Sequence, residues 1–408
     1  MHLLLIHQAF VTTGEAGGTR HIELARWLIR RGYRLTVITS PVSYLTGEAK
    51  RGTDTPREET VDRIRILYAP TSSGLHRGFV QRLFAFFSFM FSSYRLALSV
   101  ADVDVVWGTS PNLFQALSAW AAARRKRARF LLEIRDLWPD FAIGMGVLKN
   151  PVLIWGARLL ERFLYRKADR IIVNSPGFIP HVQRLSGKTP ALVPNAADVE
   201  MFTADENVDL AGTASWRKEN EFVVMYTGAH GPANDLDIAL AAARILRDRG
   251  AAIRFVFVGS GKEKARLVAL SEALKLANVT FLPPVSKAEI KNLIAAADAG
   301  LAILKAIPEF TTTYPNKVFD FMAAGKPVLC QIDGVIRDVV ERYDAGIFVS
   351  PGCAEALADA ASELAADRER GRRMGRNGRE AIRNDFSREK TAMKFEAELD
   401  ALSADLRG

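Results

Sequence analysis

Short apolar runs alternate along the first half of the chain with stretches whose apolar residues recur every three or four positions. The apolar runs span residues 3–6, 35–39, 64–68, 103–107, 130–134 and 170–174. Between the first two runs, residues 21–31 have the spacing of an amphipathic helix. Apolar strands that alternate with helices are typical of a parallel sheet covered on both faces, so this half predicts a doubly wound α/β domain.

The same alternation starts again at Phe222. Its apolar runs span residues 223–226, 253–258, 279–281, 300–303, 327–330 and 345–349. Residues 199–220 are polar and lack an apolar period, which is typical of a connection. We therefore predict an N-terminal domain over residues 1–200 and a C-terminal α/β domain over residues 201–385. A helix over residues 386–408 is expected to pack back on the N-terminal domain.

The composition is that of a globular protein, with 408 residues, 49% of them hydrophobic and 25% charged. This length suits two domains that each bury a core. Cys330 and Cys353 have neither a C-x-x-C spacing nor a His/Cys ligand spacing, so we expect no disulfide framework and no structural zinc. Residues 1–6 are too short for the core of a signal peptide, and we interpret them as a first strand of a cytoplasmic protein.

Positive charge is concentrated in the N-terminal half. Residues 1–200 carry 27 basic and 16 acidic side chains, whereas residues 201–408 carry 28 and 30. A basic domain favours an anionic partner such as nucleic acid, an anionic membrane surface or an anionic substrate. Nucleic acid is not expected, because the chain has no recognition motif and its basic residues are interleaved with apolar ones.

Residues 79–98 are the main candidate for membrane contact. Their uncharged core, residues 83–94, is shorter than the roughly 18 residues that a bilayer requires. In a helix, residues 79, 83, 86, 87, 90 and 94 form one apolar stripe, but Phe84, Phe89 and Phe91 lie off it. We predict that Phe84, Phe87 and Phe91 contact the headgroup region. The alternative is a helix wholly buried in its domain. Residues 151–170 repeat the pattern around Trp155.

Two glycine-rich turns each follow a predicted strand and precede a predicted helix. Gly17 and Gly18 lie in the first domain, and Gly259, Gly261 and Lys262 lie in the second. Such glycines allow backbone N–H groups to approach an anion at a helix start. Both turns are equally explained as tight connections, and Lys262 as a solvated surface lysine.

The most specific stretch is T-T-T-Y-P-N-K-V-F-D-F-M-A-A-G-K-P-V, residues 311–328. Pro315 suits the first turn of a helix, where the N–H groups of residues 316–318 are free, and Asp320 lies one turn further on. Amides at a helix start bind anions, and a carboxylate accepts hydrogen bonds from hydroxyl groups. We therefore expect this helix to face a diphosphate and Asp320 to face a sugar.

This stretch is similar to the E-A-M-A-C-G-x-P-V block of the family 4 glycosyltransferases. Further similarities are Gly17-Gly18, R-G-Y-R-L-T-V-I at residues 31–38, V-P-N-A-A-D at residues 193–198, Gly228 at the start of the second domain, and Phe386-Ser387. The resemblance covers nearly the whole chain. It implies the GT-B fold, in which two Rossmann-like doubly wound domains face each other across the active-site crevice.

The resemblance also implies the reaction. Members of the family transfer a sugar from a nucleotide donor to a hydroxyl group with retention at the anomeric carbon, and no metal or other cofactor is expected. The residues expected to bind the donor are Gly17, Gly18, Gly228, Lys262, Thr313, Tyr314, Asn316, Lys317, Val318 and Asp320.

E-I-R-D-L-W-P, residues 133–139, resembles a run of the fucosamine-transferase-like branch, whose members build bacterial surface polysaccharides such as lipopolysaccharide O-antigen. This implies a UDP-linked amino or deoxy sugar as donor, a polyprenyl-diphosphate-linked saccharide as acceptor, and a place on the inner face of the plasma membrane. Arg135, Asp136 and Thr109 are the expected catalytic residues, with Thr109 near the place of a family histidine. An ion pair that ties a loop is the alternative for Arg135 and Asp136.

The chain departs from the family in the donor site. The E-x7-E motif becomes T-x6-D over residues 313–320, so the first carboxylate is absent and the second is shorter. Ala229 and Asn234 stand near the positions of the usual Arg and Lys of the first loop, and we expect Lys317 and Lys262 to replace those cations.

Three other interpretations compete with this one. D-x-D at residues 102–104 is similar to a metal-binding motif, but it opens a buried strand and is not expected to bind a metal. A second alternative is that the chain is a nucleotide-sugar epimerase of the same fold. This function would not explain the basic, aromatic surface of the N-terminal domain. A non-catalytic nucleotide-sugar-binding membrane partner is permitted by the missing first carboxylate, and sugar turnover by the purified protein would distinguish it from an enzyme.

Overall fold

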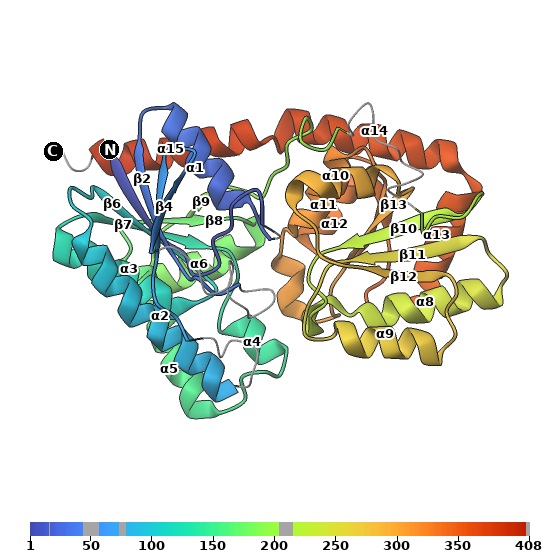
Figure 1. Ribbon diagram of the computed structural model, residues 1–408, viewed down its shortest axis with the longest axis horizontal. Helices are drawn as coiled ribbons and strands as arrows, with labels where there is room; N and C mark the ends of the chain where they lie inside the picture. Colours follow the sequence, from blue (N-terminus) through green and yellow to red (C-terminus); the bar gives the residue numbers. More distant parts are fainter. Residues whose placement is uncertain (16, 44–56, 73–78, 204–214, 405–408) are drawn as a thin grey trace. The chain divides into compact units, whose positions relative to one another are not determined.

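A computed structural model of the chain describes residues 1–15, 17–43, 57–72, 79–203 and 215–404. The chain divides into two units (Figure 1). The first comprises Met1–Thr12, Gly18–Pro194 and Glu389–Gly408, and the second comprises Thr13–Gly17 and Asn195–Arg388. Both contain a parallel sheet covered by helices, which confirms the predicted fold class.

The sheet of the first unit has the strand order β4-β5-β2-β1-β6-β7-β8-β9. All neighbouring strands are parallel except β4 and β5, an antiparallel pair that the apolar pattern did not predict. The strands are β1 (His2–Ile6), β2 (Arg34–Thr39), β4 (Glu58–Val61), β5 (Ile64–Tyr68), β6 (Val105–Thr109), β7 (Arg129–Ile134), β8 (Arg170–Val173) and β9 (Ala191–Leu192).

Helices cover both faces of this sheet because its strands are apolar on both faces. Alternate residues of β1 enter different cores, Leu4 and Ile6 on one side and Leu3 and Leu5 on the other. The helices of the first core are α2 (Phe79–Ser99), α3 (Leu113–Lys126), α5 (Pro151–Lys167) and α6 (Ile179–Ser186), and those of the second are α1 (Arg20–Arg30) and α15 (Arg388–Ala404). The short α4 (Asp140–Gly144) follows β7.

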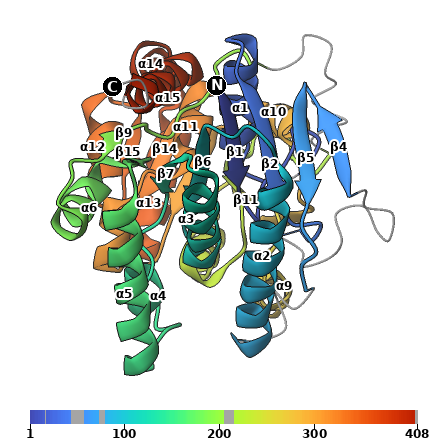
Figure 2. The ribbon, with the colours of Figure 1, turned by 90° about the vertical axis from the view of Figure 1, so that its left-hand side faces the viewer.

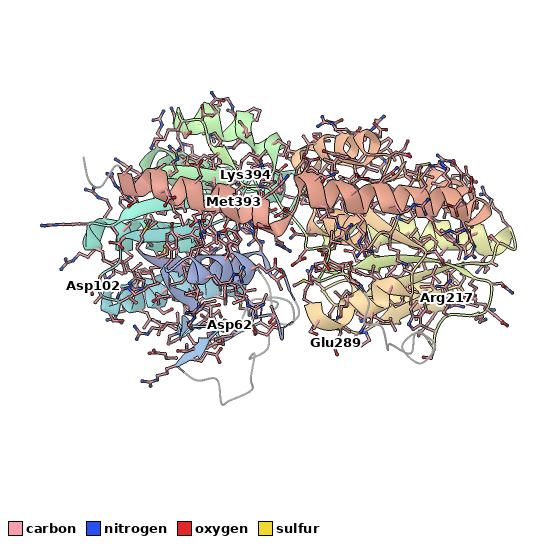
Figure 3. All side chains as sticks on the ribbon, turned by 90° about the horizontal axis from the view of Figure 1, so that it is seen from above. Asp62, Asp102, Arg217, Glu289, Met393 and Lys394 are labelled. Carbon is pink, nitrogen blue, oxygen red and sulfur yellow. The ribbon has the colours of Figure 1, made fainter. Side chains whose placement is uncertain are left out.

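The C-terminal helix α15 packs on the first unit through Phe395, which is fully buried. The Phe395 ring lies 4.6 Å from the Trp107 ring, centroid to centroid. Glu398 forms an ion pair with Arg170 at 2.5 Å. Met393 and Lys394 lie on the outer side of the helix, where Met393 is 55% exposed (Figure 3).

Helix α2 is neither wholly buried nor wholly exposed. Its buried positions are Ala85, Phe89, Ser93 and Ala97, at a spacing of four residues, and Ser93 Oγ lies 2.9 Å from Ser118 Oγ of α3. The predicted stripe was therefore wrong about Phe89, because the face of α2 that meets α3 passes through this residue.

The three phenylalanines predicted to contact a membrane differ in exposure. Phe84 is 65% exposed and Phe91 is 63% exposed. Phe87 instead packs against Phe114 of α3, with ring centroids 4.6 Å apart. No helix in the described ranges is long and apolar enough to cross a membrane.

The sheet of the second unit is parallel throughout and has the strand order β12-β11-β10-β13-β14-β15. The strands are β10 (Phe222–Thr227), β11 (Ile253–Val258), β12 (Val279–Leu282), β13 (Ala299–Ile303), β14 (Val328–Gln331) and β15 (Gly346–Phe348). One face is covered by α10 (Lys287–Ala295), α11 (Asn316–Ala323), α12 (Val335–Arg342) and α14 (Arg368–Asp385), and the other by α8 (Leu236–Asp248), α9 (Lys264–Ala273) and α13 (Ala354–Ala366).

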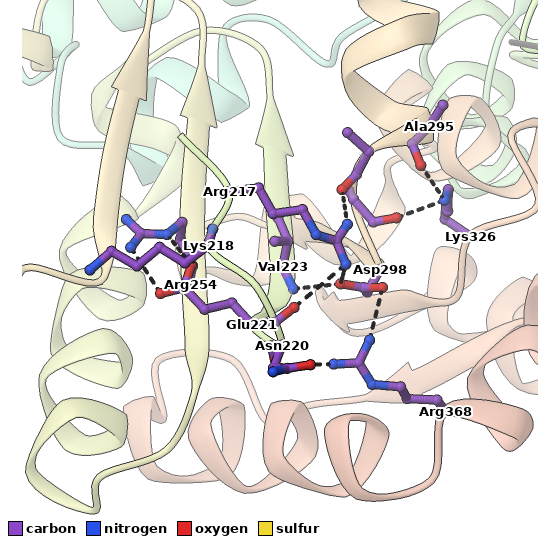
Figure 4. Close-up of polar contacts among 12 residues, drawn as sticks. Arg217, Lys218, Asn220, Glu221, Val223, Arg254, Ala295, Asp298, Lys326 and Arg368 are labelled. Carbon is purple, nitrogen blue, oxygen red and sulfur yellow. Dashed lines mark hydrogen bonds and ion pairs between the residues drawn. The ribbon is translucent and has the colours of Figure 1, made fainter. Parts of the chain in front are cut away.

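An ion-pair cluster fixes the start of the second unit to the amino edge of its sheet (Figure 4). Asp298, just before β13, accepts a hydrogen bond from Val223 N at 2.8 Å and pairs with Arg217 at 3.0 Å. Arg254 of β11 donates two hydrogen bonds to Glu221, at 2.6 and 2.9 Å. These charges satisfy one another at the amino edge. Open α/β sheets bind ligands at the opposite edge, where the strands have their carboxyl ends.

Candidate active site

The loops after β10 and β11 touch each other backbone to backbone. Gly228 has φ +140°, and a Cβ on Gly259 would lie 1.9 Å from Gly228 O. A Cβ on Gly261 would lie 2.5 Å from His230 O. Packing alone therefore requires glycine at positions 259 and 261. This supports the interpretation of the turn after β11 as a tight connection.

The lysines beside this turn have different surroundings. Lys264 Nζ donates hydrogen bonds to Gly259 O and Leu282 O, both at 2.7 Å, so it ties the loop to β12. Lys262, one of the predicted diphosphate ligands, is exposed. Its role in donor binding stays a prediction.

Lys317, in the first turn of α11, faces the loop after β10. Its ammonium group lies 4.0 Å from the centroid of the Tyr226 ring and 3.3 Å from Asn234 Oδ1. A Cβ on Gly228 would lie 3.7 Å from Lys317 Nζ, so only a glycine leaves this side of the ammonium group open. Within the described residues Lys317 contacts no carboxylate. Burial lowers the pKa of Lys317 to about 7.

The start of α11 has no side-chain cap in the described part of the chain, because Pro315 occupies the N-cap position. Asn195, the asparagine of the V-P-N-A-A-D segment, fixes the preceding loop by donating a hydrogen bond to Tyr314 O at 2.6 Å. The uncapped N–H groups of α11 lie next to Lys317, which has no carboxylate partner within the described residues. This arrangement can bind an anion. All of these residues belong to the second unit.

Other side chains of the same stretch are used by the core. The Thr313 hydroxyl donates a hydrogen bond to Phe310 O at 2.8 Å. Val318 is fully buried, and the Tyr314 ring packs against Phe319 with centroids 5.5 Å apart. Any contact of Val318 with a donor would therefore use the backbone, and the Thr313 hydroxyl could serve only as an acceptor while it donates to Phe310 O.

Asp320 is paired, which the sequence did not indicate. Its Oδ2 accepts a hydrogen bond from Lys287 Nζ of α10 at 2.7 Å, and both side chains are mostly buried. Its Oδ1 is buried and has no partner in the described structure. An ionised oxygen buried without a donor is costly, so a ligand hydroxyl group at this position would be stabilising.

His230 is a buried residue of the same loop that sequence reasoning missed. It is fully buried, and neither ring nitrogen has a hydrogen-bond partner in the described structure. Burial lowers its pKa to about 4, and the charges of Lys264 and Lys317 act in the same direction. A lone histidine gives no signal in sequence beyond its place two residues after Gly228.

In the first unit, polar side chains gather at the carboxyl ends of the strands. Glu133, at the end of β7, accepts hydrogen bonds from Arg20 Nε and His21 Nε2, each at 2.8 Å. Arg20 also donates to Val193 O and Pro194 O, both at 2.7 Å. Burial alone would raise the pKa of Glu133, but the charges of His21 and Arg20 and the hydrogen bond from His21 outweigh it and hold the pKa well below its usual range.

Arg135 and Asp136 follow directly after β7. The Ser110 hydroxyl accepts hydrogen bonds from the N–H groups of Arg135, at 2.8 Å, and Asp136, at 3.2 Å. Arg135 Nη1 lies 3.3 Å from Nε2 of His7, which follows β1. Burial raises the pKa of Asp136 to about 6, against the opposing charge of Arg135. The strand-end placement expected for this pair is therefore present.

The remaining predicted residues lie apart from these contacts. Thr109 is fully buried, and its hydroxyl donates to Ser110 O at 3.1 Å. Gly17 and Gly18 are both exposed, and a Cβ on Gly18 would meet nothing within 4 Å, so packing does not require glycine there. Asp102 lies in an exposed turn before β6. The described residues contain no cluster of three or more His, Cys, Asp or Glu side chains that could hold a metal ion.

Both halves of the chain match glycosyltransferase families. Residues 16–196 match the Glycosyl transferase 4-like domain, and residues 213–381 match the Glycosyl transferases group 1 family. The chain is 27% identical over 318 residues to the putative colanic acid biosynthesis glycosyl transferase WcaI of Escherichia coli strain K12, covering 74% of this chain and 76% of that relative.

Solved structures share the fold at low sequence identity. Sucrose-phosphate synthase from Thermosynechococcus elongatus has a TM-score of 0.78 and 17% identity, and the alignment covers 99% of both chains. Anabaena Alr3699/HepE, solved in complex with UDP and glucose, has a TM-score of 0.73 and 16% identity, covering 98% of this chain and all of that one. These likenesses establish the GT-B fold that the sequence resemblance implied.

Proposed function

Because the chain joins a glycosyl transferase 4-like domain to a group 1 glycosyl transferase domain, and is thus a glycosyltransferase of the GT-B fold, we propose a specific reaction for it. It transfers an N-acetylated amino or deoxy sugar from a UDP-sugar to a polyprenyl-diphosphate-linked saccharide, with retention at the anomeric carbon. The reaction takes place at the inner face of the plasma membrane. By this proposal, the chain is a member of the fucosamine-transferase-like branch.

The donor assignment rests above all on Lys317. It is a mostly buried ammonium group beside Gly228 and the uncapped start of α11, and it has no carboxylate partner in the described structure. A diphosphate supplies the missing negative charge. The complex of HepE with UDP supports uracil as the base of the donor.

The same groups would stabilise the leaving group. As the bond between the sugar and the diphosphate breaks, negative charge grows on the diphosphate, and Lys317 and the α11 amides are already placed to receive it. Such fixed donors act without a metal ion, and we propose that none is required. Asp320, held by Lys287, would accept a hydrogen bond from the ribose.

The acceptor assignment rests on the strand ends of the first unit. Arg135 and Asp136 are positioned by Ser110, and the carboxyl group of Asp136 is mostly ionised at neutral pH because its pKa is about 6. An ionised carboxylate can orient an acceptor hydroxyl group, and the guanidinium of Arg135 can bind an anionic part of the acceptor. The similarity to WcaI, which is named a putative colanic acid biosynthesis glycosyl transferase, supports a polysaccharide product.

Calorimetric titration with UDP, GDP, ADP and CDP tests the donor site directly. UDP should bind most tightly, and Lys317→Met should weaken it by roughly 1.5–3 kcal/mol, as expected for a lost charge-assisted contact. Lys394→Met, which changes an exposed lysine of α15 outside the donor site, is the matched control. Wild-type affinity in the Lys317→Met variant would remove Lys317 from the donor site.

A further inference from the structure

Exposed large apolar side chains are unevenly distributed over the molecule. The described part of the chain has nine, and eight of them lie on α2 or on residues 147–159. The eight are Phe84, Phe91, Leu98, Val147, Val152, Leu153, Trp155 and Leu159. Clustered exposed apolar side chains mark interaction surfaces, whereas single ones are ordinary. The five on residues 147–159 have no role in the reaction proposed above.

The first turns of α5 project from the first unit. Asn150 caps the helix by accepting hydrogen bonds from Val152 N and Leu153 N, at 2.9 and 3.2 Å. Of residues 151–159 only Ala157 is buried, whereas Leu164 and Tyr165, further along, are fully buried. Figure 2 shows the starts of α2 and α5 extending past the sheet at the same end, with α3 between them.

Along α5, basic residues come mostly after the exposed apolar ones. Its exposed charged residues are Arg158, Arg162, Arg166 and Lys167. Its one acidic residue, Glu161, is buried and accepts a hydrogen bond from His181 Nε2 at 2.7 Å. At 1.5 Å per residue, Arg158 and Arg162 lie about 5 and 10 Å along the helix from Trp155, which matches the depth at which amphipathic elements enter the headgroup boundary.

The projecting end of α5 lies at the same edge of the sheet as the acceptor residues. In a parallel sheet each strand leads at its carboxyl end into the following helix, and β7 leads through Arg135 and Asp136 to α4 and α5. Asp140, the first residue of α4, pairs with Arg158 of α5 at 3.6 Å. The loop that carries Asp136 is therefore connected to α5 by the chain and by an ion pair.

We propose that residues 147–159, the α5 tip, are a second lipid-contact element that inserts Val152 and Trp155 into an anionic bilayer surface while Arg158 and Arg162 contact lipid phosphates. Lipid is favoured over a protein partner because the tip combines exposed apolar residues with basic ones and exposes no carboxylate. Together with α2, the tip would place the Arg135–Asp136 edge at the bilayer; that consequence, unlike the lipid contact itself, rests on the proposed function.

Co-sedimentation with vesicles of equimolar phosphatidylcholine and phosphatidylglycerol, without any donor, tests the tip. The double variant Val152→Ser/Trp155→Ser should lower the partition coefficient by about tenfold or more, since two large apolar side chains leave the lipid. Met393→Ser, which removes an exposed apolar residue of α15, should bind like the wild type. Circular dichroism and thermal melting should be unchanged in both, because the replaced side chains are exposed.

Trp155 itself provides a second readout. Of the six tryptophans it alone is exposed in the structure, so its emission is separated by comparison with Trp155→Phe. Brominated phosphatidylglycerol vesicles should quench the wild-type emission and leave the Trp155→Phe emission unquenched.

The proposal is overturned if Trp155 emission is unquenched while the protein sediments with vesicles. It is also overturned if the tip variant binds vesicles normally, or if the tip variant converts a wild-type dimer to a monomer without affecting vesicle binding. None of these outcomes depends on sugar transfer, so glycosyltransferase activity can fail or hold independently.

Discussion

Lys317 shows how far a single residue could be assigned from sequence. The missing cations of the first loop and the helix start pointed to Lys317, and the structure places its ammonium group beside Gly228, as that argument required. Its contacts with the Tyr226 ring and Asn234 Oδ1 were not predictable, because they join residues more than 80 positions apart. The ion pair between Lys287 and Asp320 was not predictable either, because nothing in the sequence of α10 or of α11 alone indicates that the two side chains meet.

Donor affinity is predicted to depend on pH through Lys317. Its pKa in the free protein is about 7, so the ammonium group loses its proton as the pH rises above 7. A bound diphosphate favours the protonated form, and binding above pH 7 must therefore take up a proton. The affinity for UDP-glucose, whose diphosphate does not titrate in this range, should fall by up to about tenfold per pH unit above 7.

Calorimetry between pH 6 and pH 9 in buffers of different ionisation enthalpy measures both the affinity and the proton uptake. Lys317→Arg is the matched variant, because a guanidinium stays charged throughout this range. It should flatten the profile. A wild-type profile that is already flat, with no proton uptake, would contradict a role for Lys317 at the diphosphate.

Asp320→Ala should weaken nucleotide binding by roughly 1.5–3 kcal/mol, because the ribose loses a hydrogen bond to a charged acceptor. Lys287→Met is the informative comparison, since it breaks the same ion pair and keeps the carboxylate. If Asp320 serves only to hold Lys287, both variants will lower the melting temperature and neither will change nucleotide affinity in calorimetry.

At the scale of elements, the buried charges at the end of β7 belong to the scaffold of the first unit. Arg20 joins Glu133 to the backbone of residues 193 and 194, and both side chains are almost completely buried. The E-I-R-D-L-W-P motif therefore combines two roles: Glu133 faces inward to a salt bridge, and Arg135 and Asp136 follow the strand end. Strand β7 ends at Ile134, between Glu133 and this pair. The partners of Glu133 lie more than 100 positions away in the chain, so the sequence pattern alone did not reveal its structural role.

Arg20→Met is predicted to lower the free energy of unfolding by about 3–5 kcal/mol, because it leaves the buried Glu133 carboxylate without the Arg20 guanidinium. The control is Arg26→Met, which breaks the exposed pair with Asp62 and should cost at most about 1 kcal/mol. Urea denaturation monitored by fluorescence measures both. Equal effects of the two substitutions would show that Glu133 gains little from Arg20.

The strands and helices themselves were largely predictable, because their apolar periods are regular. Strands β2, β5, β7, β11 and β13 all lie within a residue or so of the apolar runs that predicted them. Helix α2 was harder, because it is apolar on almost every side and its period does not identify the inner face. Only the contact with α3 decides that Phe89 is buried and Phe84 exposed.

At the scale of the whole molecule, the uneven charge of the chain predicts salt-dependent binding to anionic membranes. The excess of basic residues in residues 1–200 accompanies the exposed apolar residues of α2 and the α5 tip, which belong to the same unit. Coulombic attraction to anionic lipid is screened by salt, whereas burial of apolar side chains is not.

Binding of the wild-type protein to phosphatidylglycerol-containing vesicles should therefore weaken as sodium chloride is raised, without disappearing at high salt. Phe84→Ser/Phe91→Ser should reduce the binding that remains at high salt, because both side chains are exposed and carry the apolar part on α2, and the α5 tip should supply the rest. Sedimentation across a salt series measures this. Complete release of the wild-type protein at moderate salt would mean that the apolar residues do not enter the lipid.

Sugar turnover tests the central claim most directly. Purified protein is incubated with bacterial membranes and a panel of nucleotide sugars, and release of nucleoside diphosphate is recorded together with the appearance of labelled sugar in the lipid extract. One UDP-linked donor should release UDP in proportion to labelled lipid, and Lys317→Met should lower the rate by about tenfold or more. An epimerised nucleotide sugar without release of UDP, or no turnover of any donor, would contradict the assignment of this chain as a glycosyltransferase that uses Lys317 to bind the donor diphosphate.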